Sequence, residues 1–150
     1  METKQITKSD EELYCEVHRN LEMSAESTTA VLKKVENKKL LTHLTEVIMK
    51  STALLEKTEE LMKQRGIEAE SISKMKQLSV DAGIMMNTMF DSSDSHIAEM
   101  MVKGLEMGVV SLRNMLTDNP PRDESLAELC TEVVNLESTY AHTIGKYVEQ

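Results

Sequence analysis

Glu137 is the residue of this chain best placed to bind a metal ion inside a helical bundle, because helical spacing puts it at the centre of an apolar stripe. The other positions at the middle of such stripes are Ser24, Ser51, Gly104 and Gly108. A di-iron centre in a bundle needs a Glu from each of two helices and a Glu-x-x-His from each of the other two, all facing inward. One inward carboxylate does not meet that requirement. We therefore expect no metal site and keep Glu137 only as a weak candidate ligand.

Two roles remain open for Glu137. It could be a metal ligand, or a proton-transfer group whose pKa is raised by burial. It could instead be a structural acid held by Asn20, Ser24 or Tyr140, which would fix helix register as buried polar residues do in coiled coils. We favour the structural role, because hard and borderline metals need several carboxylate or imidazole ligands.

The four histidines do not complete a site around Glu137. On helical wheels, His18, His96 and His142 project to the outer faces of their helices, and His43 lies on a flank. The sequence also contains no nucleophile elbow, P-loop, dinucleotide fingerprint or zinc-ligand spacing. We therefore predict no catalytic and no cofactor-binding residue.

Gly104 and Gly108 form a Gly-x-x-x-Gly pattern within one predicted helix. A glycine inside a helix costs up to about 1 kcal/mol relative to alanine, so we expect another helix to approach closely at these positions. The pattern predicts helix packing and not phosphate binding, because phosphate loops precede a helix instead of interrupting one.

Apolar residues recur at spacings of three and four in five segments, which predicts five amphipathic helices in a single domain, 1–150. The predicted helices cover about 8–36, 38–65, 71–90, 95–118 and 121–149. Ser9 or Asp10 is expected to cap the first of them. The short links after the first and fourth helices indicate two antiparallel hairpins. The long stretch between the hairpins can cross the bundle from end to end and carry the short helix, which is the connectivity of a ferritin-like up-down four-helix bundle.

Three segments resemble a known group of proteins. They are Met86-Asn-Thr-Met-Phe-Asp-Ser-Ser-Asp-Ser-His-Ile-Ala-Glu-Met-Met-Val-Lys-Gly-Leu-Glu-Met-Gly108, Val17-His-Arg-Asn-Leu-Glu-Met-Ser24, and the closing helix from Leu136-Glu137 through Tyr140. They are similar to uncharacterised ferritin-like four-helix-bundle proteins of Gram-positive anaerobes. The resemblance implies a ferritin-like fold without an established activity. It also implies that Tyr140 stands where a metal-binding relative would carry the His of Glu-x-x-His.

Methionines are concentrated on both sides of the polar segment 91–95. They include Met85, Met86, Met89, Met100, Met101 and Met107. Core packing is the interpretation we favour; a partner-binding surface comes second and a copper(I) site third. Four stripes suffice to close a bundle, which leaves apolar residues of the segment 71–90 outside its core. We predict a homodimer, or an unidentified protein partner, with an interface formed by Met85, Met86, Met89 and Phe90.

The composition excludes several classes of partner. Of the 150 residues, 40% are apolar and only 3% aromatic, and the net charge is -9. This charge repels phosphate backbones and anionic lipid, so we expect neither nucleic acid nor a membrane as partner. The N-terminal residues form no apolar leader and no run is long enough to span a bilayer, which favours a cytoplasmic location. Cys15 and Cys130 are too isolated for a zinc site or a disulfide framework, so we expect free thiols.

These observations favour a non-enzymatic, methionine-rich bundle that lacks a complete di-iron site, needs no cofactor, and serves as a protein-interaction or ligand-binding module. The alternative is a metal-binding ferritin-like protein, for iron storage or di-iron oxidation, with an atypical or intersubunit site. That alternative depends on fold analogy alone.

Overall fold

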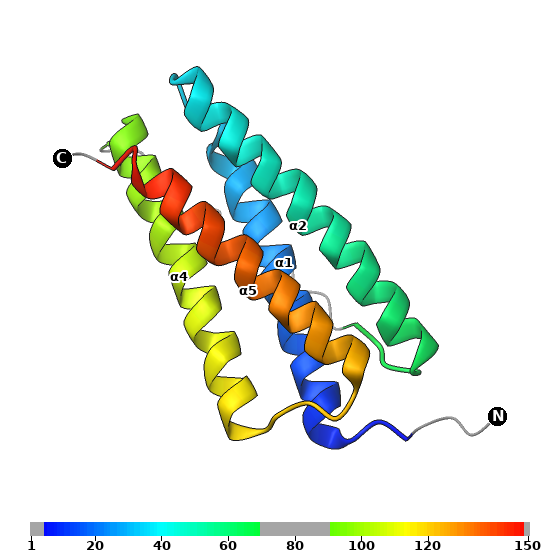
Figure 1. Cartoon of the computed structure of the whole chain (residues 1–150). Helices are drawn as coiled ribbons and strands as arrows, with labels where there is room; N and C mark the ends of the chain where they lie inside the picture. Colours follow the sequence, from blue (N-terminus) through cyan, green and yellow to red (C-terminus); the bar gives the residue numbers. More distant parts are fainter. Residues whose placement is uncertain (1–4, 70–90, 149–150) are drawn as a thin grey trace.

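Four long helices make up the described part of the computed structural model, which covers residues 5–69 and 91–148. They are α1 (Lys8–Leu32), α2 (Lys38–Gln64), α4 (Asp94–Asp118) and α5 (Glu124–Gly145) (Figure 1). This arrangement confirms the predicted all-α four-helix bundle, and the predicted helix at 71–90 falls outside the described residues. Within the described ranges, no helix has the length and apolar character that crossing a membrane requires.

Neighbouring helices of the bundle run antiparallel (Figure 1). α1 pairs with α2 and α4 with α5, and the two hairpins pack together through α2 on α5 and α1 on α4. α1 and α5 begin at the same end, where the Asp10 carboxylate accepts hydrogen bonds from the loop before α5. α4 begins at the opposite end, where the Asp94 carboxylate accepts bonds from the backbone N–H groups of Glu36 and Asn37. The segment between α2 and α4 therefore connects opposite ends of the bundle.

Each helix begins after a residue whose side chain accepts a hydrogen bond from the first turn. These N-cap residues are Thr7, Asn37, Ser93 and Asp123. The cap of α1 is thus Thr7, whose hydroxyl oxygen lies 3.1 Å from the backbone nitrogen of Asp10, and not the predicted Ser9 or Asp10. The Asp10 side chain is buried and instead accepts a hydrogen bond from the backbone N–H of Asp123, in the loop before α5.

α1 and α5 are shorter than the sequence predicted. α1 ends at Leu32 instead of residue 36, because the next turn is tighter and the N–H of Val35 bonds to the carbonyl of Leu32, three residues back. α5 begins at Glu124 instead of residue 121, because Asp123 caps its first turn. Its last helical residue is Gly145.

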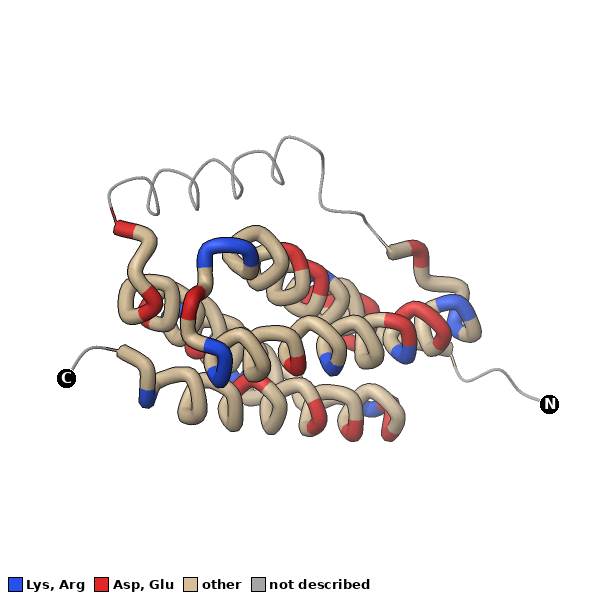
Figure 2. The backbone as a smooth tube through the Cα atoms, turned by 90° about the horizontal axis from the view of Figure 1, so that it is seen from above, with Lys and Arg blue, Asp and Glu red and all other residues tan. Residues whose placement is uncertain are grey.

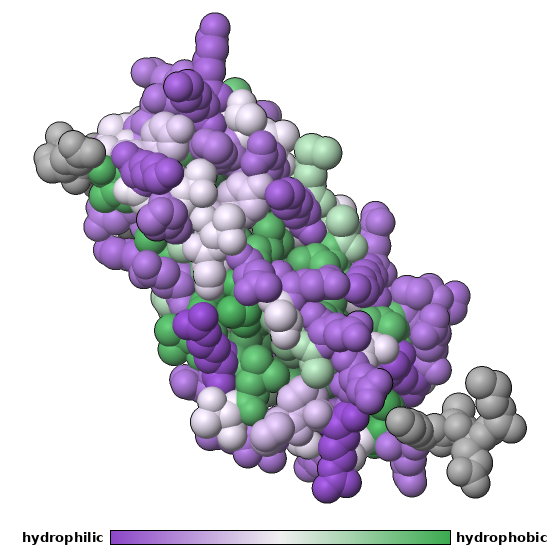
Figure 3. Space-filling view, viewed as in Figure 1, coloured by the Kyte–Doolittle hydropathy of each residue, from purple (hydrophilic) through white to green (hydrophobic). Residues whose placement is uncertain are grey.

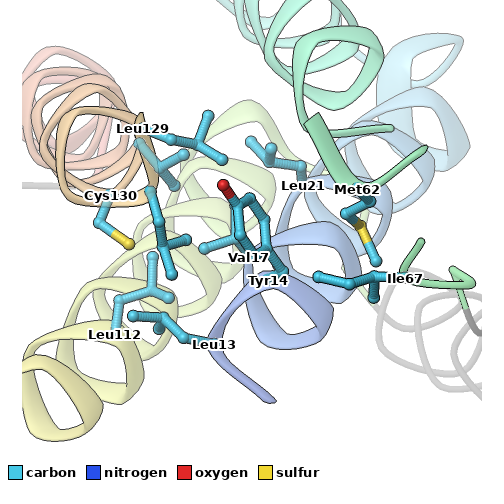
Figure 4. Close-up of a cluster of buried hydrophobic side chains, with 11 residues drawn as sticks. Leu13, Tyr14, Val17, Leu21, Met62, Ile67, Leu112, Leu129 and Cys130 are labelled. Carbon is cyan, nitrogen blue, oxygen red and sulfur yellow. The ribbon is translucent and has the colours of Figure 1, made fainter. Parts of the chain in front are cut away.

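The hydrophobic core consists of two clusters, one in each half of the bundle. The Tyr14 cluster, drawn in Figure 4, contains Leu13, Tyr14, Val17, Leu21, Met62, Ile67, Leu112, Leu126, Leu129, Cys130 and Val133. The Tyr140 cluster contains Val31, Leu40, Leu44, Val47, Ile97, Ala98, Met101, Leu105, Tyr140, Ala141 and Ile144. All four helices contribute to both clusters, so burial of apolar surface in each half holds the two hairpins together.

A polar network closes the bundle beside the Tyr14 cluster. The Asp123 carboxylate accepts a hydrogen bond from the Tyr14 hydroxyl at 2.8 Å and two from the Arg65 guanidinium. Burial alone would raise the pKa of Asp123, but the bonds from Arg65 and Tyr14 outweigh it and hold this pKa below its usual value. The network joins α1, the end of α2 and the start of α5.

Candidate functional site

A polar layer separates the Tyr14 cluster from the Tyr140 cluster at the middle of the bundle. It is formed by Asn20 and Ser24 of α1, Ser51 of α2, Gly108 of α4 and Glu137 of α5. Four of these residues, Ser24, Ser51, Gly108 and Glu137, lie between the residues of the two clusters on their own helices. Asn20 belongs to the layer because its side chain contacts Gly108 and Glu137. The hydroxyls of Ser24 and Ser51 are 3.4 Å apart. The Asn20 amide donates a hydrogen bond to the Gly108 carbonyl at 3.3 Å. Ser51 and Glu137 are therefore buried inside the bundle and Ser24 is partly buried beside them, as their spacing in the sequence indicated.

Glu137 is the acidic residue of this layer. Its side chain is only 2% exposed, and its Oε1 atom has no hydrogen-bond partner among the described residues. Burial raises the pKa of the carboxyl from 4.5 to about 8, and a hydrogen bond from the Asn20 side chain offsets only part of that rise. Glu137 is consequently protonated at neutral pH. A neutral buried acid of this kind suits either a structural role or proton transfer.

Of the three partners expected for Glu137, Asn20 is the one that binds it. The Tyr140 hydroxyl instead donates to Glu46 Oε2 at 2.6 Å. The Tyr140 ring also lies 5.1 Å from the Lys50 ammonium, so its polar contacts are with α2. Ser24, the third expected partner, faces α2 as well.

The two glycines of the Gly-x-x-x-Gly pattern have different surroundings. A Cβ atom added at Gly108 would lie 2.9 Å from Asn20 Nδ2 and from Glu137 Oε2, so this glycine leaves room for two polar side chains. The expectation for Gly104 was wrong. Gly104 is exposed, and an added Cβ would meet nothing within 4 Å. The close contact is therefore made at Gly108 alone, and side chains of α1 and α5 make it instead of a helix backbone.

His18 is buried between α1 and α2, with 5% exposure, and does not lie on an outer face as predicted. Its Nε2 atom is 3.1 Å from Glu59 Oε1, and its Nδ1 atom is 3.5 Å from Glu22 Oε2. The hydrogen bond with Glu59 compensates for part of the loss of water around the imidazole, whereas Nδ1 has no hydrogen-bond partner among the described residues. The sequence of α1 carries no signal of this burial, because an acid one turn later is equally typical of an exposed i,i+4 pair.

The potential metal ligands are dispersed. Across residues 5–69 and 91–148, no group of three or more His, Cys, Asp or Glu side chains is arranged to hold a metal ion. His43 and His96 are half-buried and His142 is exposed. Neither Cys15 nor Cys130 forms a disulfide bond within the described part of the chain, and burial raises the pKa of Cys130 to about 12.

The predicted interface residues Met85, Met86, Met89 and Phe90 lie outside the described residues, so the homodimer stays a prediction. The methionines that follow them are divided between the core and the surface. Met101 belongs to the Tyr140 cluster, and Met100 packs against it. Met107 is 73% exposed on α4.

An open groove of about 720 Å³ runs along the outer face where α4 and α5 meet. Its apolar lining consists of Val102, Val109, Val110, Ala141 and Gly145. Val110 is 56% exposed, and its neighbour Met107, one turn earlier in α4, extends this apolar surface. The space-filling view shows apolar side chains among polar ones along the junction of the two helices (Figure 3). No expectation from the sequence pointed to this groove.

The charged side chains of the groove differ from those of the whole molecule. Acidic residues are spread over all parts of the described chain, with fewer basic ones between them (Figure 2), and the net charge is -9. The groove, in contrast, is lined by Arg113, Lys146 and His142 against one acid, Glu106. Within the described part of the chain, neither Arg113 nor Lys146 forms an ion pair. Their charges are available to a ligand.

The two basic side chains lie at opposite ends of the groove. A Cβ atom at Gly145 would be 4.0 Å from Val102 Cγ2, which places the adjacent Lys146 at the level of Val102. Arg113 follows Val102 in the same helix, about 16 Å along its axis at 1.5 Å per residue. Glu106 lies between these two levels.

No protein-family model matches the sequence of this chain, and a search of curated proteins finds no match.

Proposed function

We propose that this protein is a non-enzymatic, ferritin-like binding module and that the α4–α5 groove is its binding site. The groove itself carries the proposal, because it combines the exposed Val110 and the half-buried Val102 with two basic side chains that lack ion-pair partners among the described residues. Clefts that combine apolar side chains with a few polar groups are the usual form of binding sites on soluble proteins. Two antiparallel hairpins joined by a segment between opposite ends of the bundle support the ferritin-like topology.

An anionic apolar dye provides a first test of the groove. We expect 8-anilinonaphthalene-1-sulfonate to bind the full chain and to shift the methyl NMR signals of Val102, Val109 and Val110. The aromatic rings should cover the valines, while the sulfonate should pair with Arg113 or Lys146. Val110→Glu should weaken binding at least about tenfold, because it places a like charge beside the sulfonate and removes apolar surface.

Met49→Glu is the matched control for this experiment. Met49 is 66% exposed on α2, so this variant adds the same charge at an exposed apolar position outside the groove. It should leave dye affinity unchanged. Shifts confined to methyl groups elsewhere, or equal losses in both variants, would show that the groove is not the binding site.

The alternative function, a metal-binding ferritin-like protein, is addressed by iron analysis. Protein purified without chelators should neither retain stoichiometric iron nor oxidise ferrous iron faster than buffer does. The reason is that Glu137 is the only carboxylate of the polar layer among the described residues, whereas a di-iron centre needs several. Retained iron together with an oxidation rate that is lost in Glu137→Ala would support the metal-binding alternative.

A further inference from the structure

The charges of the α4–α5 groove restrict what can occupy it. Arg113 stands at one end and Lys146, with His142 nearby, at the other, and the apolar lining lies between them. A ligand with a single anionic headgroup could pair with one end only. A ligand that pairs with both ends must therefore carry two anionic groups, separated by about the 16 Å that Val102 and Arg113 span along α4.

An α-helix meets this requirement. Its residues rise 1.5 Å each, so acidic side chains three turns apart lie about 16 Å from one another on the same face. Apolar side chains in the turns between them would cover Val102, Val109 and Val110, as the apolar faces of amphipathic helices do in hydrophobic grooves. α4 and α5 form an antiparallel pair, and the furrow between two such helices can accept the side-chain ridges of a third.

We infer that the groove binds an acidic amphipathic helix of a partner protein, with acidic residues at both ends of an apolar stripe. This inference rests on the proposed function of the groove as a binding site. Glu106, which lies between the basic ends, adds a second condition. The middle of the partner helix carries a neutral or basic side chain opposite Glu106, because a third acid would be repelled there.

Two labelled synthetic helices test the inference by fluorescence anisotropy with the full-length protein. Both have about 20 residues and a leucine stripe. The first has glutamates three turns apart at the ends of the stripe and a lysine midway, and the second has these charges exchanged. The first helix should bind at least tenfold more tightly than the second. Raising the salt concentration should reduce this difference, because exposed charges are screened.

Charge reversal in the protein provides the matched comparison. Arg113→Glu combined with Lys146→Glu should exchange the preference between the two peptides. Lys63→Glu, which reverses an exposed charge in the last turn of α2, should leave the preference unchanged. Circular dichroism should show the parental helix content for each variant. If the double variant does not fold, Arg113→Glu alone replaces it, and the expected result is then a smaller loss of the preference for the first peptide.

The possible outcomes distinguish an error about the ligand from an error about the binding site. Equal affinity for both peptides, or a preference that survives the double reversal, would overturn the acidic helix. If dodecanoate displaces the dye from the groove and the acidic peptide does not, the occupant is a single-headed amphiphile and the groove remains the binding site. If neither the dye nor the peptides bind there, both the inference and the proposed function are wrong.

Discussion

Glu137→Gln should raise the free energy of unfolding by several kcal/mol at pH 8 and change it little near pH 4.5. Burial raises the pKa of Glu137 to about 8 in the folded protein, whereas the value for the free side chain is 4.5. Between these two pH values the folded state keeps the proton and the unfolded state has lost it. Stability of the parent protein therefore falls by about 1.4 kcal/mol per pH unit across this window on account of this group. Glutamine stays neutral and does not contribute to the fall.

Urea unfolding at pH 5, 6, 7 and 8 measures this effect as the difference between variant and parent, in which the titrations of other groups cancel. Glu128→Gln is the control, because Glu128 is an exposed acid of the same helix. Its effect at pH 8 should be much smaller than that of Glu137→Gln, because no buried carboxyl is replaced. A difference for Glu137→Gln that does not change with pH would mean that Glu137 ionises as it does in water.

Leucine substitutions at the two glycines of α4 should have opposite effects on stability. Gly108→Leu should destabilise the bundle by about 1 to 3 kcal/mol through overpacking, even though leucine favours helix more than glycine does. A Cβ at this position already comes within 2.9 Å of the partly buried Asn20 and the buried Glu137. Gly104→Leu should stabilise by up to about 1 kcal/mol, because only the helix propensity changes at an open position.

Thermal and urea unfolding of the two variants at neutral pH would measure both effects. Each substitution is made in the same helix and adds the same side chain, so the difference between them isolates the crowding at Gly108. A Gly108→Leu variant that is as stable as Gly104→Leu would mean that the polar layer can open to admit the leucine. The space that we assign to Asn20 and Glu137 would then not depend on glycine.

The four-helix bundle could be predicted from the sequence because apolar residues recur at the helical spacing of three and four. A stripe of apolar residues along a helix indicates which face of that helix is buried. The same periodicity placed Ser51 and Glu137 inside, since polar residues at the centre of a stripe have no other direction to face. The boundary of α1 was less predictable, because Asp94, which binds the turn after this helix, is distant in the sequence.

Positions at the edge of a stripe could not be assigned from periodicity. Four residues advance a helix by about 400°, so Gly104 lies about 40° further round than Gly108. That rotation moves Gly104 from the interior to solvent. His18 is at the corresponding edge of the α1 stripe, and only the position of α2 determines that it is covered. The α4–α5 groove could not be predicted from the sequence. The outer faces of two helices form it, and the apolar periodicity of each helix does not determine how the two faces are placed relative to each other.

The division of the core into two clusters determines how the protein can open. Because the Tyr14 and Tyr140 clusters each take side chains from all four helices, separating one hairpin from the other would break both clusters at once. Loss of one cluster would leave the other complete, with the polar layer as the boundary between them. The cooperative units of this bundle are therefore transverse halves and not hairpins. Local unfolding should begin at one end of the bundle and stop at the polar layer around Glu137. Such an event would expose one half of each helix to solvent while the other half stays folded.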